Sequence, residues 1–305
     1  MTRELRKAPA EPDPGLFGPD SVSWQLHAQT AMWLAGIRSL YLQALHPRAA
    51  AGVVQNSNFR DDPLGRLVRT ANFVGATVYC TREEVAERAA RVRRVHRELR
   101  AVDPETGKRF RVDEPELLLW VHCAEVSSFL SVVRRAGFPL TAAHADRYFD
   151  EQRLSASLVG LAPDEVPGSV AQMKAYLTAM RPRLRRTPDA DEIYRFLHRP
   201  PVQGALALGL RLYEPVVGHL GYSLLPRWAV AMYGRRAYPA PVATAALRAV
   251  TAGVRTFLRN AARLTPGGPR LGRLEPHPLW AVDRLGPWAM PSATRLPNKT
   301  PPSDH

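Results

Sequence analysis

The chain has 305 residues, of which 45% are hydrophobic and 23% are charged, a composition typical of a folded protein rather than a disordered one. Its 42 basic and 28 acidic residues give a net charge of +14, but the charge is scattered among helix-like segments, so we expect no nucleic-acid partner. Two cysteines are too few for a disulfide framework or a four-cysteine zinc site, which excludes both.

The N-terminal residues 1–19 are rich in proline and charge and predict a flexible tail. They lack the apolar segment of a secretory signal, and no uncharged apolar run in the chain reaches the roughly 18 residues of a membrane-spanning helix. We therefore expect a cytoplasmic protein without a transmembrane segment. The basic surface leaves peripheral contact with a membrane open.

Apolar residues then recur at spacings of three and four, which predicts an all-α fold with one bundle-like helical domain over residues 20–264. A proline-rich C-terminal tail is expected over 265–305. Helices are expected from Ser21 or Ser23 to about Leu45, over 63–79, 81–102 and 114–136, from Thr141 and from Ser169, and over 189–198, 202–222, 226–234 and 241–263.

Two of these helices carry the sequence signature of a capping box. Thr81 stands three residues before Glu84, and Asp113 stands three residues before Glu116. Between them, the turn-rich segment 103–112 is the one stretch expected to contain β structure.

Several chemistries lose their usual sequence support. The chain has no Gly-x-Gly-x-x-Gly, no phosphate-binding loop, no Gly-x-Ser-x-Gly elbow and no His-Glu-x-x-His. The histidines of the predicted helices have no glutamate three residues earlier, which excludes the usual di-iron bundle. Cys-x-x-Cys-His is also missing, so covalently attached haem is excluded.

Two histidines interrupt the apolar stripes of consecutive helices. His96 lies between Val92 and Leu99 on the stripe of its helix, and His122 lies four residues before Val126 on the next. Both side chains should point inward. They are either core histidines bonded to neighbouring polar groups or neutral imidazoles of the kind that bind haem iron.

The helix at 63–79 carries a mixed polar face. Arg66, Arg69, Thr70 and Phe73 follow steps of three, one and three, which places charge, hydroxyl and aromatic groups on one side. Such a face is expected to line a pocket, where the arginines could bind haem propionates or an acidic substrate. In the alternative interpretation, the aspartates before this helix cap it and the arginines are solvated.

These segments together resemble the oxygenase family that contains the bacterial latex-clearing rubber oxygenases and the fungal oxygenase that shortens the prenyl chain in mycophenolic acid synthesis. The resemblance runs from about Leu45 through Phe196. Its most specific parts are Leu45-His46-Pro47, the run from Phe59 to Thr70, Arg93-Arg94-Val95-His96, and Asp113 through Phe129 with Leu118-Leu119-Trp120-Val121-His122 at its centre.

The resemblance implies an all-helical domain with a globin-like core that binds haem b through one axial histidine. His96 falls at about the position of that ligand, and His122 is the second candidate. Arg66, Arg69 and Thr70 match an Arg-x-x-Lys-Thr face beside the haem, with Arg69 in the lysine position. Phe73 would complete the cofactor-binding face.

One departure concerns the catalytic base. The rubber oxygenases carry a glutamate shortly before this face, whereas this chain has no glutamate between Glu11 and Glu83. His46 is the nearest alternative base, although it could instead cap the preceding helix by donating to its last carbonyl groups.

We therefore predict a haem-b-dependent oxygenase that acts with dioxygen on a small apolar molecule, of isoprenoid type. Polyisoprene is not expected as the substrate, because the enzymes that cleave this extracellular polymer are exported. Two alternatives stay open: a haem-binding sensor or carrier without turnover, and a metal-free helical protein that binds an acidic partner through its basic surface.

Overall fold

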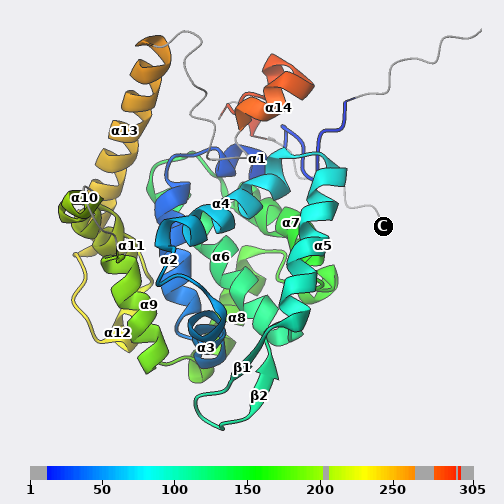
Figure 1. Ribbon diagram of the computed structural model, residues 1–305. Coiled ribbons are helices and arrows are strands. Elements are labelled where there is room, and N and C mark those ends of the chain that lie inside the picture. The colour runs from blue at the N-terminus through cyan, green and yellow to red at the C-terminus, as the bar shows by residue number, and fades with distance from the viewer. Residues whose placement is uncertain (1–11, 202–205, 265–277, 293–294, 297–305) are drawn as a thin grey trace, which may run out of the picture.

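The structure, a computed structural model, describes residues 12–201, 206–264, 278–292 and 295–296. Within them the chain is mostly helical, with one small hairpin, which confirms the predicted helical class (Figure 1). The first half contains α1 Val22–His27, α2 Met32–Gln43, α3 Pro47–Asn56, α4 Pro63–Tyr79, α5 Arg82–Glu98, β1 Arg100–Val102, β2 Arg109–Arg111 and α6 Pro115–Arg135. The second half contains α7 Ala142–Leu158, α8 Val170–Met180, α9 Pro188–His198, α10 Leu206–Tyr213, a π-helical segment Glu214–His219, α11 Leu220–Ser223, α12 Arg227–Tyr233, α13 Ala240–Leu264 and α14 Pro278–Leu285.

The first predicted helix is in fact two helices, α1 and α2, separated by a turn at 28–31. Ser21 caps α1, since its hydroxyl accepts a hydrogen bond from the backbone N–H of Trp24 at 3.0 Å. The next helix, α3, was not expected from the sequence. Pro47 is its first residue, a position where proline favours a helix because no N–H partner is needed there.

The two predicted capping boxes have different outcomes. The box of Thr81 and Glu84 is confirmed, with reciprocal hydrogen bonds at the start of α5. The predicted box of Asp113 is wrong: α6 begins after Glu114 without a side-chain cap, and Asp113 pairs with Arg111 at 2.6 Å.

The β structure begins earlier than expected. The helix predicted to reach residue 102 ends at Glu98, because Arg100–Val102 pairs antiparallel with Arg109–Arg111. Ala101 lies opposite Phe110, and both side chains are buried against the helices. This hairpin fixes the path of the chain between α5 and α6.

The central helix of the fold is α6. It packs along α2 and also contacts α1, α3, α7, α8 and α13 (Figure 1). Among the described residues it alone has the length and hydropathy of a membrane span, but most of it is buried in the protein, so it is a core helix. Trp120 and Ala124 belong to one apolar core, and Val126 and Phe129 to a second.

Part of the predicted C-terminal tail is ordered against the domain. In α14, Ala281 and Leu285 pack with Trp24 and Tyr79. The indole N–H of Trp24 also donates to the backbone carbonyl of Ala289 at 2.9 Å. Residues 265–277, where this tail was expected to begin, lie outside the described part of the chain.

Candidate functional site

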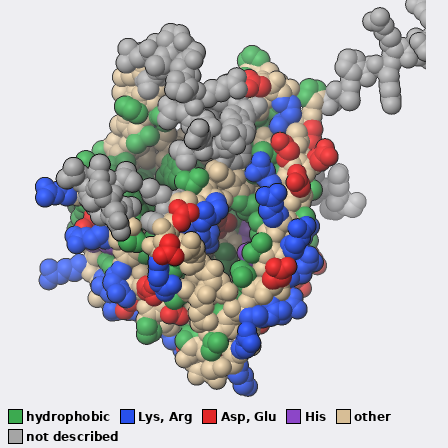
Figure 2. All heavy atoms as spheres, in the orientation of Figure 1, with side chains coloured by type: hydrophobic (Ala, Val, Ile, Leu, Met, Phe, Trp, Pro, Cys, Tyr) green, Lys and Arg blue, Asp and Glu red, His purple; other side chains and the backbone are tan. Residues whose placement is uncertain are grey.

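A hollow lies where α4 and α5 diverge. The two helices meet at residues 80–81, and α6 passes behind the space between them (Figure 1). In the same orientation, Figure 2 shows this face hollowed, with a histidine side chain visible inside. The predicted residues of α4, α5 and α6 therefore lie on helices that border one space.

Arg66 is a half-buried guanidinium held by neutral oxygen atoms. Its Nε donates to the hydroxyl of Ser57 at 3.0 Å, and its Nη1 donates to the hydroxyl of Thr70 at 2.5 Å. The Thr70 hydroxyl in turn donates to the Arg66 carbonyl at 3.1 Å. Burial lowers the Arg66 pKa, and no carboxylate of the described residues pairs with this side chain. A positioned cation without a counterion suits an anionic group of a ligand.

Arg69 lies in different surroundings, although it shares a helix face with Arg66. Its guanidinium is exposed and pairs with Asp62 at 2.8 Å. Asp62 also caps α4 by accepting from the backbone N–H of Gly65 at 3.0 Å. The alternative interpretation, in which an aspartate caps the helix and the arginine is solvated, thus describes Arg69. Arg66, Thr70 and Phe73 are instead half-buried.

His96, on α5, is half-buried and makes no hydrogen bond with a described residue. Burial lowers its pKa; the charge of Asp113 raises it, and that of Arg66 lowers it further. Because the charge of Arg66 on α4 acts on His96 on α5, these two predicted residues lie near each other. A neutral imidazole with an unoccupied nitrogen is the form that binds haem iron.

His122, on α6, is 7% exposed, and burial lowers its pKa to about 4. Its Nε2 is buried without a hydrogen-bond partner. Buried polar atoms are rarely left unpartnered, so this nitrogen indicates a missing partner. Both His96 and His122 consequently fit an axial ligand, as the sequence left open.

Glu125 is a further titratable group near His122 that the sequence analysis did not consider. It lies three residues after His122 on the same side of α6 and makes no hydrogen bond or ion pair with a described residue. Burial raises its pKa to about 7. A carboxyl group that titrates near neutrality is a candidate general acid or base. The signal was the spacing His-x-x-Glu, the reverse of the Glu-x-x-His pattern considered for di-iron sites.

His27 extends this polar group towards α1 and α7. Its Nε2 lies 3.3 Å from the hydroxyl of Tyr148, and its ring meets Phe129 edge to face at 5.3 Å. Its Nδ1 has no partner, and burial lowers its pKa to about 3. The charge of Glu125 acts on Tyr148, so these groups share one buried environment.

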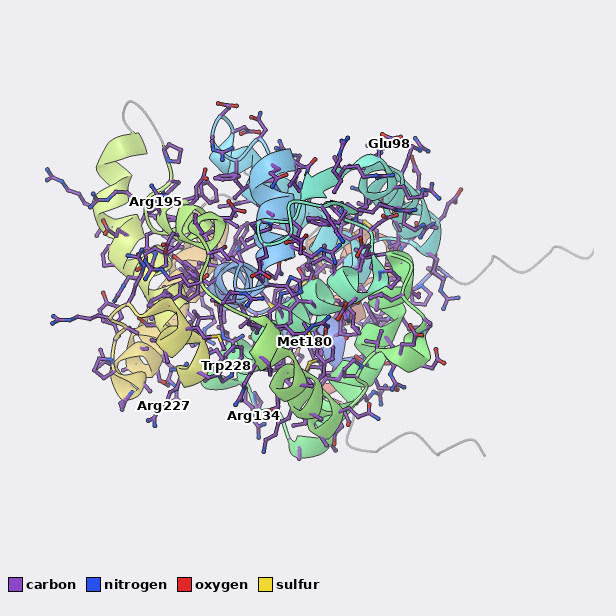
Figure 3. The ribbon with its side chains drawn as sticks, turned by 90° about the horizontal axis from the view of Figure 1, so that it is seen from below. Glu98, Arg134, Met180, Arg195, Arg227 and Trp228 are labelled. Atoms are coloured by element: carbon purple, nitrogen blue, oxygen red, sulfur yellow. The ribbon has the colours of Figure 1, made fainter. Side chains whose placement is uncertain are left out.

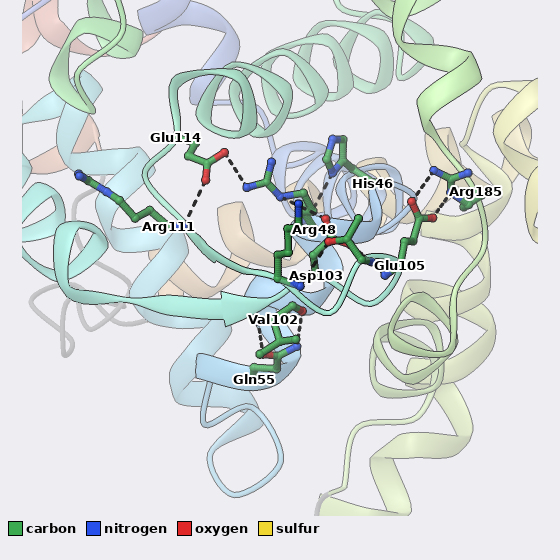
Figure 4. Close-up of polar contacts among 12 residues, drawn as sticks. His46, Arg48, Gln55, Val102, Asp103, Glu105, Arg111, Glu114 and Arg185 are labelled. Atoms are coloured by element: carbon green, nitrogen blue, oxygen red, sulfur yellow. Dashed lines mark hydrogen bonds and ion pairs between the residues drawn. The ribbon is translucent and has the colours of Figure 1, made fainter.

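His46 lies in a separate group of contacts, beside the hairpin (Figure 4). Its Nδ1 accepts from the backbone N–H of Ala49 at 3.4 Å, so it caps the following helix α3 rather than the preceding one. Its ring lies 6.2 Å from that of Trp120.

The charges around His46 also differ from those around His96. Burial, followed by the positive charges of Arg183, Arg48 and Arg185, lowers the His46 pKa to about 4, against an opposing effect of Asp103. The neighbouring Arg48 pairs with Glu114 at 2.6 Å (Figure 4). The structure therefore does not group His46 with Arg66, and its role as a base stays a prediction.

Two surface grooves lie away from these residues. One, of about 580 Å³, runs between α6, α7, α8 and α12, where Arg134 and Trp228 stand near each other (Figure 3). The other, of about 410 Å³, adjoins Met180 on α8. None of the predicted site residues lines either groove.

The described residues contain no group of three or more histidine, cysteine or acidic side chains placed to hold a metal ion. An iron held by one imidazole within a haem makes no such demand, because the porphyrin supplies four of its ligands.

Comparison with known proteins gives one match. A family model described as the catalytic domain of ER-bound oxygenase mpaB/B′ and rubber oxygenase matches residues 24–256, which include every site residue discussed above. No curated protein and no solved structure matches the chain.

Proposed function

Because this chain belongs to the family of the ER-bound oxygenase mpaB/B′ and rubber oxygenase catalytic domains, we propose that it is a haem-b-dependent oxygenase that acts with dioxygen on a small apolar substrate. Family membership supports the oxygenase chemistry. Haem dependence, an isoprenoid-like substrate and a cytoplasmic location belong to the proposal.

The observation that carries the proposal is a pair of imidazoles on α5 and α6 with unpartnered nitrogens, one of which, His96, is influenced by the uncompensated charge of Arg66. His96, or His122 in its place, would supply a nitrogen ligand to the haem iron, and Arg66 would bind a propionate. When bound there, haem b supplies the redox chemistry that activates dioxygen. The donor set fits, because burial lowers the pKa of both imidazoles and so favours the neutral form that can bind iron.

The chain's own residues would hold the cofactor, move a proton and exclude water. Thr70 fixes the Arg66 guanidinium through a 2.5 Å hydrogen bond, so that the cation is already oriented when an anionic group arrives. Glu125 would take up or release a proton at its carboxyl group, since its pKa lies near 7. The apolar side chains Phe73 and Val126 would keep water from the substrate.

The ultraviolet-visible spectrum of the purified protein, after expression with haem supply, tests the cofactor. A Soret band with about one haem per chain in a pyridine haemochrome assay is the expected result. No band after haem supply would reject haem dependence and favour a metal-free protein.

Incubation of the loaded protein with prenyl-chain compounds under air tests the activity. Oxygenated or shortened products are expected. Retention of haem without product from any candidate compound would instead favour a sensor or carrier.

A further inference from the structure

A second group of buried histidines and tyrosines lies away from the hollow, where α2 packs with α9, the π-helical segment and α11. We define the tyrosine cluster as Tyr41, Tyr194, Tyr222 and Tyr233. The ring of Tyr41, which is fully buried, lies 5.7 Å from Tyr194, 5.6 Å from Tyr222 and 6.4 Å from Tyr233. Tyr194 is half-buried beneath the guanidinium of Arg235, so the cluster extends from the core towards the surface.

A chain of polar atoms leads outward from the same buried tyrosine. The Tyr41 hydroxyl lies 2.5 Å from His198 Nδ1, and His198 Nε2 lies 3.4 Å from His219 Nδ1. His219 is half-buried. A proton that leaves Tyr41 thus has two imidazoles in sequence between it and the protein surface.

The π-helical segment Glu214–His219 creates this arrangement. A methyl group at Gly218 would lie 2.8 Å from the Cα of His198, so only glycine allows the segment to approach α9 this closely. The extra residue in the helical turn then brings His219 next to His198. Segments of this kind are frequent at functional sites.

Electrostatics keeps both partners of the short hydrogen bond neutral. Burial raises the pKa of Tyr41 well above its ordinary value, so the phenolate does not form near pH 7. Burial, followed by the charge of His219, lowers the pKa of His198 to about 4. In the neutral tautomer that carries its proton on Nε2, His198 presents its Nδ1 lone pair to the phenol proton of Tyr41.

Tyr41 differs in this respect from two of its neighbours in the cluster. The hydroxyl of Tyr222 donates to the backbone carbonyl of Arg235 at 3.1 Å, and that of Tyr233 donates to the carbonyl of Tyr41 at 2.7 Å. Backbone carbonyls anchor a hydroxyl but cannot take up its proton near pH 7. The Tyr41 hydroxyl also lies 3.2 Å from the carbonyl of Gly218, but its shorter contact is with His198 Nδ1 at 2.5 Å. Of these three tyrosines, only Tyr41 has an acceptor that can take up the proton.

We propose that Tyr41 is a redox-active tyrosine and that His198 is its proton acceptor. Tyr41 gives one electron to a one-electron oxidant of high potential, such as a metal centre oxidised by peroxide. Its O–H bond breaks as the proton binds His198 Nδ1, which leaves a neutral tyrosyl radical, an imidazolium and an oxidant reduced by one electron. His198 then passes its Nε2 proton to His219 Nδ1, and His219 releases a proton to solvent.

The buried setting is the reason for coupling the two losses. Loss of the electron alone would leave a radical cation, and loss of the proton alone would leave a phenolate, and burial disfavours either charge. Loss of both leaves a neutral tyrosine ring, and the relay through His198 and His219 carries the positive charge of the proton on to solvent. The site can therefore hold one oxidising equivalent away from the hollow between α4 and α5, whether or not the chain uses haem.

Flash oxidation of the full-length protein by photogenerated tris(bipyridine)ruthenium(III), followed by electron paramagnetic resonance, tests the proposal. We expect a long-lived tyrosyl radical that Tyr41→Phe removes and Tyr148→Phe retains. Tyr148 is the matched control, because it is also buried beside an imidazole but at 3.3 Å. His198→Gln should slow radical formation at least about tenfold, because it removes the proton acceptor.

The same radical yield and lifetime in Tyr41→Phe and in the unaltered protein would overturn the proposal. Circular dichroism and thermal melting show whether the variants fold. If Tyr41→Phe does not fold, His219→Gln replaces a half-buried end of the relay instead, and radical formation in the unaltered protein is compared in H₂O and D₂O. Slower formation in both measurements supports the relay, and unchanged rates in both contradict it.

Discussion

The two buried histidine regions of this protein differ in how their polar atoms are satisfied. In the tyrosine cluster, His198 has a neighbour at both ring nitrogens. Around the hollow, His96 has no hydrogen-bond partner among the described residues, and His122 leaves its Nε2 without one. The comparison separates histidines whose nitrogens find partners within the chain from histidines whose nitrogens do not, and the proposed cofactor would bind the second kind.

This difference has an energetic consequence. Burying an imidazole costs free energy unless both nitrogens find partners, so the hollow is held in shape by the surrounding helices at a cost. A cofactor that binds only the folded chain would offset that cost and raise the melting temperature. The tyrosine cluster gains nothing from such a ligand.

The largest expected effect comes from removing an imidazole beside the hollow. His96→Ala should abolish stoichiometric haem retention, whereas His122→Ala should leave a bound but less stable holoprotein. The Soret band and the haemochrome assay measure both, with His219→Ala as a control outside the hollow. Loss of the band in His122→Ala, with a native spectrum in His96→Ala, would reverse the assignment.

A large effect is also expected where the π-helical segment approaches α9. Gly218→Ala should destabilise the fold by about 1–3 kcal/mol, because the added methyl group meets the His198 backbone. Gly253→Ala in α13 is the matched control, because nothing lies within 4 Å of its added carbon and it should stabilise by about 0.5–1 kcal/mol. Urea unfolding measures both, and equal effects would contradict the close approach.

Glu125 should give the unliganded protein a pH dependence of stability. Its folded pKa of about 7 lies above the ordinary value, so the folded chain holds a proton that the unfolded chain has lost, and stability falls as pH rises from about 4.5 to about 7. In Glu125→Gln, the decrease in unfolding free energy over this pH range should be smaller by about 1–3 kcal/mol.

The buried histidines act in the opposite direction over the same range. Burial lowers their pKa values in the folded protein, so the unfolding free energy of the protein decreases as pH falls below about 6.5, where these histidines become protonated in the unfolded chain. The informative quantity is therefore the difference between the unaltered protein and Glu125→Gln in unfolding free energy at pH 4.5 and 7.5. An unchanged difference at the two pH values would show that Glu125 is not buried as described.

A contrast in haem binding should separate two arginines of one helix face. Arg66→Gln should weaken haem binding by about 1.5–3 kcal/mol, because it removes a charge-assisted hydrogen bond to an anionic group. Arg69→Gln should change it by less than about 1 kcal/mol, since that side chain is exposed and paired with Asp62. Haem titration of the two apoproteins measures the contrast, and equal losses would place both arginines in the pocket.

The smallest expected effect concerns His46. His46→Gln removes the cap of α3 and should cost about 1 kcal/mol or less, with the haem spectrum and carbon monoxide binding unchanged. Altered carbon monoxide kinetics at an unchanged melting temperature would instead support the predicted role as a base near dioxygen.

The sequence by itself determined those features whose hydrogen bonds or apolar contacts span a few residues. The start of α5 follows from Thr81 and Glu84, and the end of α6 from Gly137, which adopts a left-handed conformation. The family motifs also lie within short segments, so the sequence alone was sufficient to identify the family, which the family model confirms.

Only the tertiary structure decided which of these residues meet. Arg66 and Arg69 share a helix face, yet Arg66 is half-buried and donates to Ser57, whereas Arg69 is exposed and pairs with Asp62. Tyr41 and His198 are separated by 157 residues in the chain. Their contact depends on the packing of α2 against α9 and on the close approach that Gly218 permits, and no local pattern records either.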